Sequence, residues 1–505
     1  MSPSTMKFLR INKGINWNVC LNSLNIRSKF FTQRRNLSEQ KENIGANLLE
    51  NKRIIGQPTF DTHPHLLKSN ELVPGFHLQE FIERRERLVK SILETKLNVP
   101  HIVLVPSANV QYMTEKIPYV FRQNTDFRYL TGCLEPDSAL LMIIESENKY
   151  RSSLLLRQKN KHSELWEGPR TGIELAPEVF GVDDAMPINH LEEILSKIGA
   201  QNSILWYDAL NPVNSVVHKS VQSFLFSNKP KDLKEIRNKI HELRVIKSEA
   251  EQILLRKSAE IASDAIKLSI ETTKPGMTEH QLFATVDYHC RMKGAEQLAY
   301  PPVVASGENA NIIHYINNSQ EIKNGDLVLM DSGCELHGYC SDITRTWPAN
   351  GKFTPIQRTL YELVLSVQLD LISALKEISS LDEMFSIMCK LLGRRLKEAH
   401  VLTKAAGQLS LEEVAFEFCP HHVGHYLGMD VHDTPTISRK SQLQEGMLIT
   451  IEPGVYINRR NYLAKEEFRG IGIRIEDDVL YTKSGPKVIS TCPKDVESIE
   501  SLLKR

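Results

Sequence analysis

The sequence lacks a long apolar segment, a cysteine framework and a net charge, and each absence excludes a class of protein. No apolar run in its 505 residues approaches the roughly 18 to 20 residues of a membrane-spanning helix. The eight cysteines form no C-x-x-C pair, as expected of thiols in a reducing compartment. Basic and acidic residues both number 62, so no overall field attracts nucleic acid or an anionic membrane. We expect a soluble protein whose partners are recognised locally.

Acidic residues are also absent from the first 38 positions, which carry basic residues instead: Lys7, Arg10, Lys13, Arg27, Lys29, Arg34 and Arg35. Serine, asparagine and phenylalanine separate them, a composition typical of mitochondrial presequences. We interpret residues 1–38 as a presequence for the mitochondrial matrix, with a disordered basic tail or an additional cytosolic form as alternatives. Residues 39–73 are polar and show no sustained period, so we expect a linker there.

The remaining length predicts two folded domains, because single cores stop growing at roughly 250 to 300 residues. Residues 74–235 alternate helical and strand patterns, which predicts an α/β first domain. Its short apolar runs His101–Val105 and Ala139–Ile144 have strand length. In the helix that follows Pro74 we expect three arginines to form a solvated face: Arg84, Arg85 and Arg87.

Residues 236–505 show a different pattern, in which predicted helices bracket strand-like segments. This pattern predicts an α+β second domain with an inner sheet. Three capping-box patterns announce helices at Thr278 with Gln281, Thr354 with Gln357, and Ser380 with Glu383. Strand-like segments lie between these helices. Four of them lead to or contain a carboxylate: Leu327–Met330, residues 338–346, Met447–Ile451 and residues 470–480.

Those carboxylates and one imidazole form the most informative pattern in the sequence: Asp331, Asp342, His425, Glu452 and Glu476. Each lies in or beside an apolar, β-prone or glycine-bearing segment, where a buried charge costs several kcal/mol unless a cation compensates it. A single aspartate would more often form a turn or cap a helix. Two on adjacent predicted strands favour a joint role, and we predict that the five residues bind metal.

Further candidates surround this set. His421, His422, His425 and His432 fall within twelve residues and are separated by glycines, which let the chain approach a common point. Arg474 shares a predicted strand face with Glu476. A structural histidine and a surface salt bridge are the respective alternatives.

Four carboxylates and one imidazole can hold two divalent ions, with some carboxylates bridging. Oxygen-rich ligation suits Mn²⁺, and Zn²⁺ or Co²⁺ could replace it. Cys334, Cys340 and Cys419 lie nearby and would suit a softer metal, but oxygen ligands dominate. Such ions lower the pKa of a bound water to roughly 7 in single-zinc sites, so the predicted reaction is hydrolysis. Neighbouring imidazoles would stabilise the oxyanion.

Several long phrases in fixed order resemble the aminopeptidase P family of pita-bread metallopeptidases, and its mitochondrial branch in particular. In the second domain they are H-H-V-G-H-Y-L-G-M-D-V-H-D (residues 421–433), T-I-E-P-G-V-Y (450–456) and R-I-E-D-D (474–478). In the first domain they are F-R-Q-N-T-D-F-R-Y-L-T-G (121–132) and L-W-E-G-P-R (165–170). The resemblance implies a creatinase/aminopeptidase P-like α/β domain followed by a pita-bread catalytic domain.

The resemblance also implies a role for each ligand. Asp342 and Glu476 would bridge both ions. Asp331 would complete the coordination of one ion, and His425 with Glu452 that of the other. Glu452 would in addition act as the acid and base that carries protons to the leaving nitrogen.

The remaining roles concern the substrate. By resemblance, His432 and His314 would contact the scissile carbonyl, with Tyr315 beside them. His421 would line the proline-side pocket and Arg474 would orient it. Two residues of the first domain would reach toward the substrate: Trp166 and Arg170.

These roles together imply a dinuclear-metal aminopeptidase that hydrolyses the N-terminal peptide bond, prefers Xaa-Pro, and trims the N-termini of mitochondrial proteins. An Xaa-Pro bond has no N–H and a fixed φ, so it needs a dedicated pocket. The alternatives are a prolidase-type Xaa-Pro dipeptidase and a non-catalytic pita-bread binding module, and homodimerisation is left open. Substrates would be peptide or protein N-termini.

Overall fold

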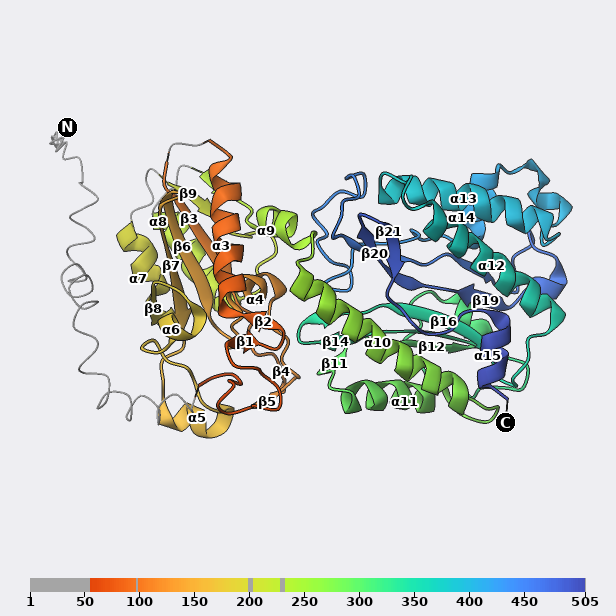
Figure 1. Cartoon of the computed structure of the whole chain (residues 1–505), viewed down its shortest axis with the longest axis horizontal. Coiled ribbons are helices and arrows are strands. Elements are labelled where there is room, and N and C mark those ends of the chain that lie inside the picture. The colour runs from red at the N-terminus through yellow and green to blue at the C-terminus, as the bar shows by residue number, and fades with distance from the viewer. Residues whose placement is uncertain (1–54, 97–98, 199–202, 228–231, 505) are drawn as a thin grey trace, which may run out of the picture. The chain divides into compact units, whose positions relative to one another are not determined.

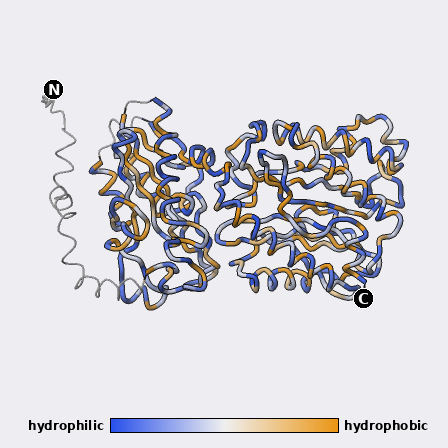
Figure 2. Tube along the Cα trace, in the orientation of Figure 1, coloured by the Kyte–Doolittle hydropathy of each residue, from blue (hydrophilic) through white to orange (hydrophobic). Residues whose placement is uncertain are grey.

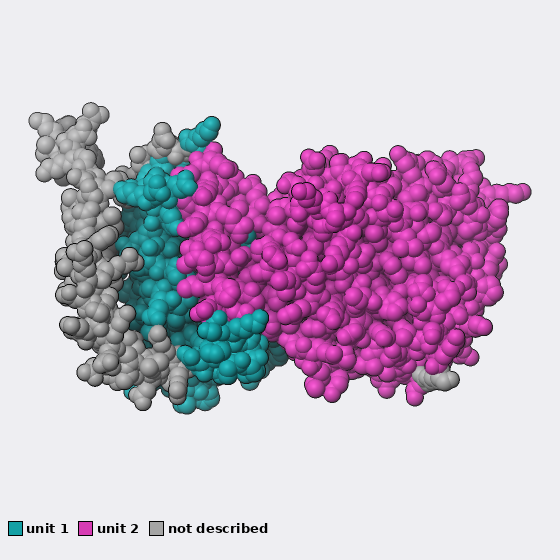
Figure 3. Space-filling view, in the orientation of Figure 1, with its two compact units in different colours: residues 1–69, 95–236 teal, residues 70–94, 237–505 magenta. Residues whose placement is uncertain are grey.

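The structure, a computed structural model of the whole chain, describes residues 55–96, 99–198, 203–227 and 232–504 (Figure 1). The chain divides into two compact units, coloured in Figure 3: residues 1–69 with 95–236, and residues 70–94 with 237–505. The expected presequence lies outside the described residues, as do residues 39–54 of the expected linker.

The described part of that linker is residues 55–73: residues 55–69 belong to the first unit, whereas strand β1 (Glu71–Val73) groups with the second. Ile55 is buried. The Gln57 side chain donates to the carbonyl of Gly132 (3.3 Å) and accepts the backbone N–H of Leu134 (2.9 Å). A buried amide that is satisfied on both sides holds the segment in place. The polar composition of the expected linker therefore does not mean that residues 55–69 lack contacts with the folded domain.

Among the described residues, the first unit contains a mixed six-stranded sheet of order β10-β9-β3-β6-β7-β8. Its strands are β3 (His101–Pro106), β6 (Ala139–Ser146), β7 (Lys149–Leu156), β8 (Asp184–Pro187), β9 (Ile204–Trp206) and β10 (Asp232–Lys234). Its helices include α4 (Thr125–Thr131), α5 (Lys161–Glu167), α6 (Ala176–Phe180), α7 (Leu191–Ile198) and α8 (Ser215–Ser227). The two apolar runs predicted as strands form the fully buried β3 and most of β6, which confirms an α/β domain.

Helix α3 (Leu78–Leu93) groups with the second unit, and the prediction for its arginines is partly wrong. Arg84 and Arg85 are 1% and 2% exposed, whereas Arg87 is exposed. Arg84 forms an ion pair with Glu251 of α10 (Glu249–Thr272), at 3.6 Å. A helical period shows which residues share a face, but not that a second element covers that face.

The second unit has an inner layer of short antiparallel strands between helices (Figure 1). The strands near the predicted ligands are β12 (Val303–Ser306), β13 (Leu327–Ser332) and β16 (Ile343–Pro348) in one sheet, β17 (Leu448–Ile451), β20 (Asp477–Thr482) and β21 (Gly485–Val488) in another, and β18 (Gly454–Ile457) with β19 (Ile471–Arg474) in a third. A further sheet joins β11 (Gln297–Leu298), β14 (Cys334–Leu336) and β15 (Tyr339–Cys340). The expected α+β domain is confirmed.

Helices cover this inner layer from both sides. On one side lie α10 and α11 (Glu279–Met292), and on the other α12 (Pro355–Ala374) and α13 (Leu381–Glu398), as Figure 1 shows. Shorter helices are α9 (Arg237–Arg244), α14 (Leu411–Phe418) and α15 (Val496–Leu502). Figure 2 shows apolar residues along the inner strands and polar residues along the outer turns. None of the described helices is both long and apolar enough to span a membrane.

Two of the three predicted capping boxes are complete. Thr278 caps α11 with Gln281, and Thr354 caps α12 with Gln357. At α13, Ser380 accepts the N–H of Glu383 (3.2 Å), but the Glu383 side chain accepts from Ser379 instead. The three helix starts are where the sequence predicted them.

Candidate metal centre

The five predicted ligands stand at strand ends or beside strands of the second unit. Asp331 is the second-last residue of β13, and Asp342 comes directly before β16. Glu452 follows β17, and Glu476 lies between β19 and β20. His425 is held beside β17, where its carbonyl accepts the N–H of Thr450 (3.0 Å). The apolar strands therefore carry the ligands to one side of the inner layer.

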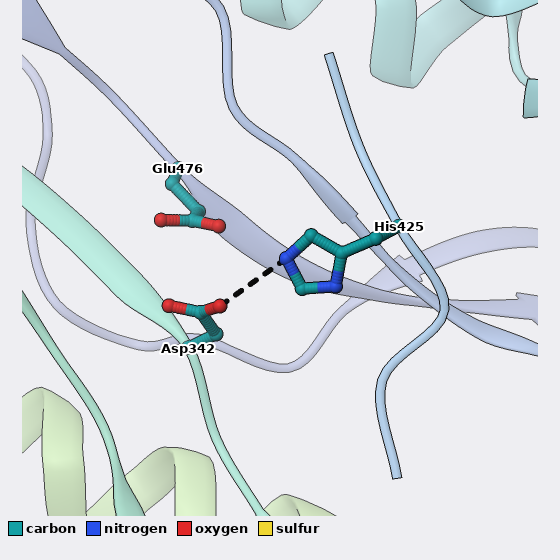
Figure 4. A group of neighbouring side chains, drawn as sticks. All are labelled: Asp342, His425 and Glu476. Atoms are coloured by element: carbon teal, nitrogen blue, oxygen red, sulfur yellow. Dashed lines mark ion pairs between the residues drawn. The ribbon is translucent and has the colours of Figure 1, made fainter. Parts of the chain in front are cut away.

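Three of the five converge most closely (Figure 4). One ligand atom from each of Asp342, His425 and Glu476 lies within 4.8 Å of the others. Nε2 of His425 is 3.3 Å from Oδ2 of Asp342 and 3.6 Å from Oε1 of Glu452. Asp331 reaches the same group through Tyr300, whose hydroxyl donates to Oδ1 of Asp331 (2.5 Å) and is hydrogen bonded to Asp342. The structure thus brings all five side chains into one cluster.

The hydrogen bonds of His425 select the ring nitrogen that faces the carboxylates. Its Nδ1 lies 3.1 Å from the carbonyl of Tyr426 and must carry a proton to donate to it. In a neutral ring, Nε2 then presents its lone pair to Asp342 and Glu452. This is the arrangement of a metal-ligating histidine whose orientation is set by a backbone carbonyl.

The carboxylates perturb one another strongly. Burial together with Asp331 raises the pKa of Asp342, and burial together with Asp342 raises that of Glu476 well above its usual range. Burial also raises the pKa of Glu452 to about 7. Burial alone would lower the pKa of His425, but Asp342 and Glu452 raise it to about 9. Without metal, the raised pKa values mean that bound protons reduce the negative charge of this cluster, as a cation would.

This crowding is the test of whether metal fits the site. Four carboxylates and one properly oriented imidazole offer the oxygen-rich donor set that hard divalent ions prefer. A divalent ion among them would reverse the pKa shifts, because it favours the ionised carboxylates and the neutral ring. The residues present therefore fit divalent metal.

A buried arginine links the cluster to His421, which the sequence predicted to line a proline-side pocket. Arg474, 2% exposed, donates to Oδ2 of Asp331 (2.5 Å) and to the hydroxyl of Tyr456 (2.8 Å). Nε2 of His421 is hydrogen bonded to that same hydroxyl (2.9 Å). Burial and the charge of Arg474 lower the pKa of His421 to about 4, so the ring is neutral at pH 7. The predicted pocket residues His421 and Arg474 thus share one contact, Tyr456.

Two further predicted histidines lie at the edge of the cluster. The rings of His432 and His425 meet edge to face with centroids 4.5 Å apart. Desolvation and the charge of His425 lower the pKa of His432 to about 4. His314 is exposed, and its charge contributes to lowering the pKa of both His432 and His421, which places it near them.

The other predicted substrate residues have different surroundings. The Tyr315 hydroxyl is not free, because it donates to Oε2 of Glu279 (2.8 Å). Trp166 and Arg170 belong to the first unit. Trp166 on α5 is 78% exposed, whereas Arg170 is 8% exposed and donates to the carbonyl of Gln158 (2.7 Å).

Sequence reasoning missed several residues that hold the ligands. Tyr300 lies between two aspartates, and burial beside Asp331 raises its pKa, so its hydroxyl stays protonated. The Thr344 hydroxyl donates to Oε2 of Glu476 (2.6 Å) and accepts from Arg474 (3.1 Å). The only signal of Tyr300 in the sequence is its position before two prolines, which does not indicate a contact across the sheet.

Known proteins match both units. The model of metallopeptidase family M24 matches residues 253–483, and that of the aminopeptidase P N-terminal domain matches residues 81–206. Xaa-Pro aminopeptidase 3 of Rattus norvegicus is 40% identical over 463 residues, which cover 90% of this chain and 91% of the relative. The chain belongs to metallopeptidase family M24.

Other M24 relatives extend the likeness to named mitochondrial proteins and solved structures. Intermediate cleaving peptidase 55, mitochondrial, of Arabidopsis thaliana is 40% identical and covers 89% of this chain and 88% of the relative. Zn-substituted aminopeptidase P of E. coli matches with a TM-score of 0.78 at 32% identity, over 85% of this chain and 98% of that one. Icp55 of Saccharomyces cerevisiae matches with a TM-score of 0.77 at 33% identity, over 86% and 99%. The family and two-domain fold predicted from the sequence are confirmed.

Proposed function

We propose that this M24 protein is a metal-dependent aminopeptidase that hydrolyses the N-terminal peptide bond and prefers Xaa-Pro. The observation that carries the proposal is the convergence of Asp342, His425 and Glu476, extended by Asp331 and Glu452. The names of the relatives, Xaa-Pro aminopeptidase and intermediate cleaving peptidase, support this substrate class.

In this proposal the five ligands hold two divalent ions. Asp342 and Glu476 would be shared between the ions, Asp331 would serve one of them, and His425 with Glu452 would serve the other. We propose Mn²⁺ because the donors are mainly oxygen atoms. When bound, such ions supply Lewis acidity, which acidifies water and polarises the scissile carbonyl.

Glu452 is the residue we assign to proton transfer. Its carboxylate lies 3.6 Å from His425 and 3.9 Å from His421, at the edge of the cluster nearest the pocket. Thr450 donates to its Oε1 (3.4 Å), which leaves Oε2 available to exchange a proton. A carboxylate placed this way can accept a proton from water and deliver it to the leaving nitrogen.

The histidines at the edge would then handle the substrate. His432 and His314 donate hydrogen bonds to the carbonyl oxygen as negative charge develops on it. His421, fixed by Tyr456, contacts the proline ring, and its neutral state avoids a buried charge beside an apolar group. Arg474 holds the side chains of Tyr456 and Asp331 in position by hydrogen bonding to both.

The proposal is tested with an Arg-Pro-Pro-type peptide. We expect release of the first residue, loss of activity on chelation, and recovery on addition of Mn²⁺. Glu452→Gln should abolish turnover while peptide binding persists, because the amide can neither accept nor deliver the proton; metal analysis of the variant shows whether the ion that Glu452 would help to hold is still bound. Undiminished turnover in that variant would remove Glu452 from its assigned role.

The same assay distinguishes a prolidase-type dipeptidase. An Xaa-Pro dipeptide is offered beside the longer peptide at equal concentration. Cleavage of the dipeptide alone would overturn the aminopeptidase assignment in favour of prolidase-type activity.

We further propose that the protein acts in mitochondria, in the matrix, on N-termini of proteins located there. The acid-free residues 1–38 and the mitochondrial relative support this location. A tagged chain with and without residues 1–38 should differ in import into isolated mitochondria. Equal protection of both forms from external protease would contradict the presequence.

A further inference from the structure

A buried carboxylate outside the metal cluster, Glu279, connects two ends of the segment that carries His314. Glu279 is the first residue of α11 and is 0% exposed. Its Oε1 accepts the backbone N–H and the hydroxyl of Ser306, both at 2.8 Å, and the side-chain amide of Asn309 at 2.9 Å. Its Oε2 accepts the Tyr315 hydroxyl and the backbone N–H of Gln320, both at 2.8 Å.

These five hydrogen bonds require an ionised acid. All five partners are neutral donors, so both oxygens must act as acceptors. A glutamine of the same shape would point an amide donor at one of these groups and leave it unpaired. Burying a carboxylate is costly, but several hydrogen bonds to the charge and the N-terminus of the 14-residue α11 offset that cost.

The segment of residues 306–320 is therefore closed into a loop at Glu279. Its entry point is Ser306 at the end of β12, its exit point is Gln320, and the N–H of Glu279 also donates to the carbonyl of Gln320 (2.9 Å). His314 lies between these points and is exposed, so no burial of its own side chain holds it. Its position depends on the loop.

A second contact fixes the loop against the strand that ends at Arg474. A Cβ at Gly472 of β19 would lie 2.3 Å from the carbonyl oxygen of Ala310. Only a glycine allows the backbone of residues 307–311 to approach β19 this closely. The loop is thus fastened at Glu279 and rests on a strand of the metal centre.

We propose that Glu279 is a positioning residue for His314, and that Tyr315 acts through Glu279 and makes no substrate contact with its hydroxyl. The inference rests on the proposed function, in which His314 contacts the scissile carbonyl. Glu279 itself touches neither substrate nor metal. It sets where the imidazole of His314 meets the oxyanion.

The central experiment is a double-mutant cycle in the full, metal-loaded chain. Glu279→Gln should lower kcat by up to about 100-fold, the cost of a roughly 1 Å misplacement, with little change in KM. In a His314→Ala background the same substitution should lower kcat no further, because the group it positions is gone. An equal loss of kcat in both backgrounds would overturn the proposal.

A second, milder variant keeps the proposal testable if Glu279→Gln fails to fold. Tyr315→Phe removes one of the five donors and leaves the carboxylate buried, so it should lower kcat less than Glu279→Gln. Combined with Glu279→Gln it should add nothing. A rise in KM that persists in the combined variant would show that the Tyr315 hydroxyl binds substrate directly, contrary to the proposal.

Glu251→Gln is the matched control. Glu251 is also a buried acid in the first turn of a helix, α10. It accepts from Ser248 (2.8 Å) and Tyr339 (3.0 Å) and also pairs with Arg84 (3.6 Å). Its partners lie outside the 306–320 loop, so stability should fall while the kcat effect of His314→Ala stays unchanged. Loss of that effect would mean that any buried acid in this unit influences His314, which would overturn the specific role of Glu279.

A readout independent of activity separates this inference from the proposed function. Hydrogen exchange of residues 306–320 should become faster in Glu279→Gln, with the bound metal content unchanged. If wild-type protein cleaves no peptide, the proposed function fails while faster exchange still supports the loop anchor. Unchanged exchange at Ser306 and Gln320 would overturn the anchor whatever the activity.

Discussion

Glu476 and Asp477 are adjacent, fully buried carboxylates with opposite surroundings. Glu476 faces Asp342, and burial with this neighbour raises its pKa well above the usual range. Asp477 accepts from Arg345 (2.7 Å) and pairs with Lys494. Burial alone would raise its pKa, but the two cations outweigh burial and lower it.

The comparison shows that burial alone does not identify a metal ligand. Both residues are 1% exposed or less, so both must be compensated. The chain supplies cations to Asp477 from its own side chains. Around Glu476 it supplies further carboxylates, whose effect on the Glu476 pKa outweighs that of Arg474, so a divalent ion would complete the compensation. A cluster in which buried acids outnumber the cations that the chain supplies, Arg474 and His425, is therefore the structural mark of the candidate metal centre.

Glu476→Gln should have the largest effect, a loss of metal binding, and this effect would sharpen the contrast between Glu476 and Asp477. The variant loses the carboxylate proposed to bridge the two ions, so its metal affinity should fall by more than the roughly 10- to 100-fold that loss of an outer-shell partner causes. Peptidase activity should disappear with it. The metal-free variant should unfold at equal or higher denaturant concentration than metal-free wild type, because a carboxyl that must be held protonated among other buried acids is gone. Calorimetric titration with Mn²⁺ and urea unfolding measure both, and unchanged affinity would break the comparison.

Asp477→Asn should have the opposite profile. It leaves Arg345 buried with a neutral partner, and breaking a buried pair costs about 3–5 kcal/mol. Metal stoichiometry should stay at the wild-type value, since the cationic partners of Asp477, Arg345 and Lys494, are not among the proposed ligands. Urea unfolding of the metal-free protein and metal analysis of the loaded protein test the two halves separately. A large loss of bound metal with normal stability would contradict the assignment of Asp477 to structure.

The smallest expected effect is the pH dependence of the metal-free protein. The pKa of Glu452 is raised from 4.5 to about 7, and that of His425 from 6.5 to about 9. Both groups bind their proton more tightly when folded, so each stabilises the fold at low pH. The contribution of Glu452 is lost between pH 4.5 and 7, and that of His425 between pH 6.5 and 9.

The free energy of unfolding without metal should therefore fall by roughly 3 kcal/mol for each of the two groups as the pH rises through its window. With metal bound the slope should reverse, because ligation needs Glu452 ionised and His425 neutral. Urea unfolding at a series of pH values, with chelator or with Mn²⁺, gives both slopes. A flat profile for the metal-free protein between pH 5 and 9 would refute the crowding on which the comparison depends.

Much of the site was predictable because its ligands lie at the ends of short apolar strands. The strands ending near Asp331 and Glu452 have a residue pattern of their own, and the helices between them begin at capping boxes that the sequence shows directly. Family resemblance, now confirmed, added the order of the five ligands. The roles assigned to individual residues remain predictions for the variants above.

Other features could not be predicted, because they depend on residues far apart in the chain. Arg84 belongs to a helix with an apparently solvated polar face, yet it meets Glu251 more than 160 residues later. Tyr300 touches aspartates 31 and 42 positions away. Tyr315 follows His314 in the sequence, but its hydroxyl contacts Glu279. Local pattern gives residue type and period, and says nothing of the partner across a sheet.

The sequence by itself predicted the five candidate ligands and determined the strand and helix starts around them and the family. These depend on residue identity and short-range spacing. Tertiary structure alone decided which buried acids receive a cation from the chain and which do not. The free energy of a buried charge is set by neighbours within a few ångströms, and folding brings those neighbours from distant positions.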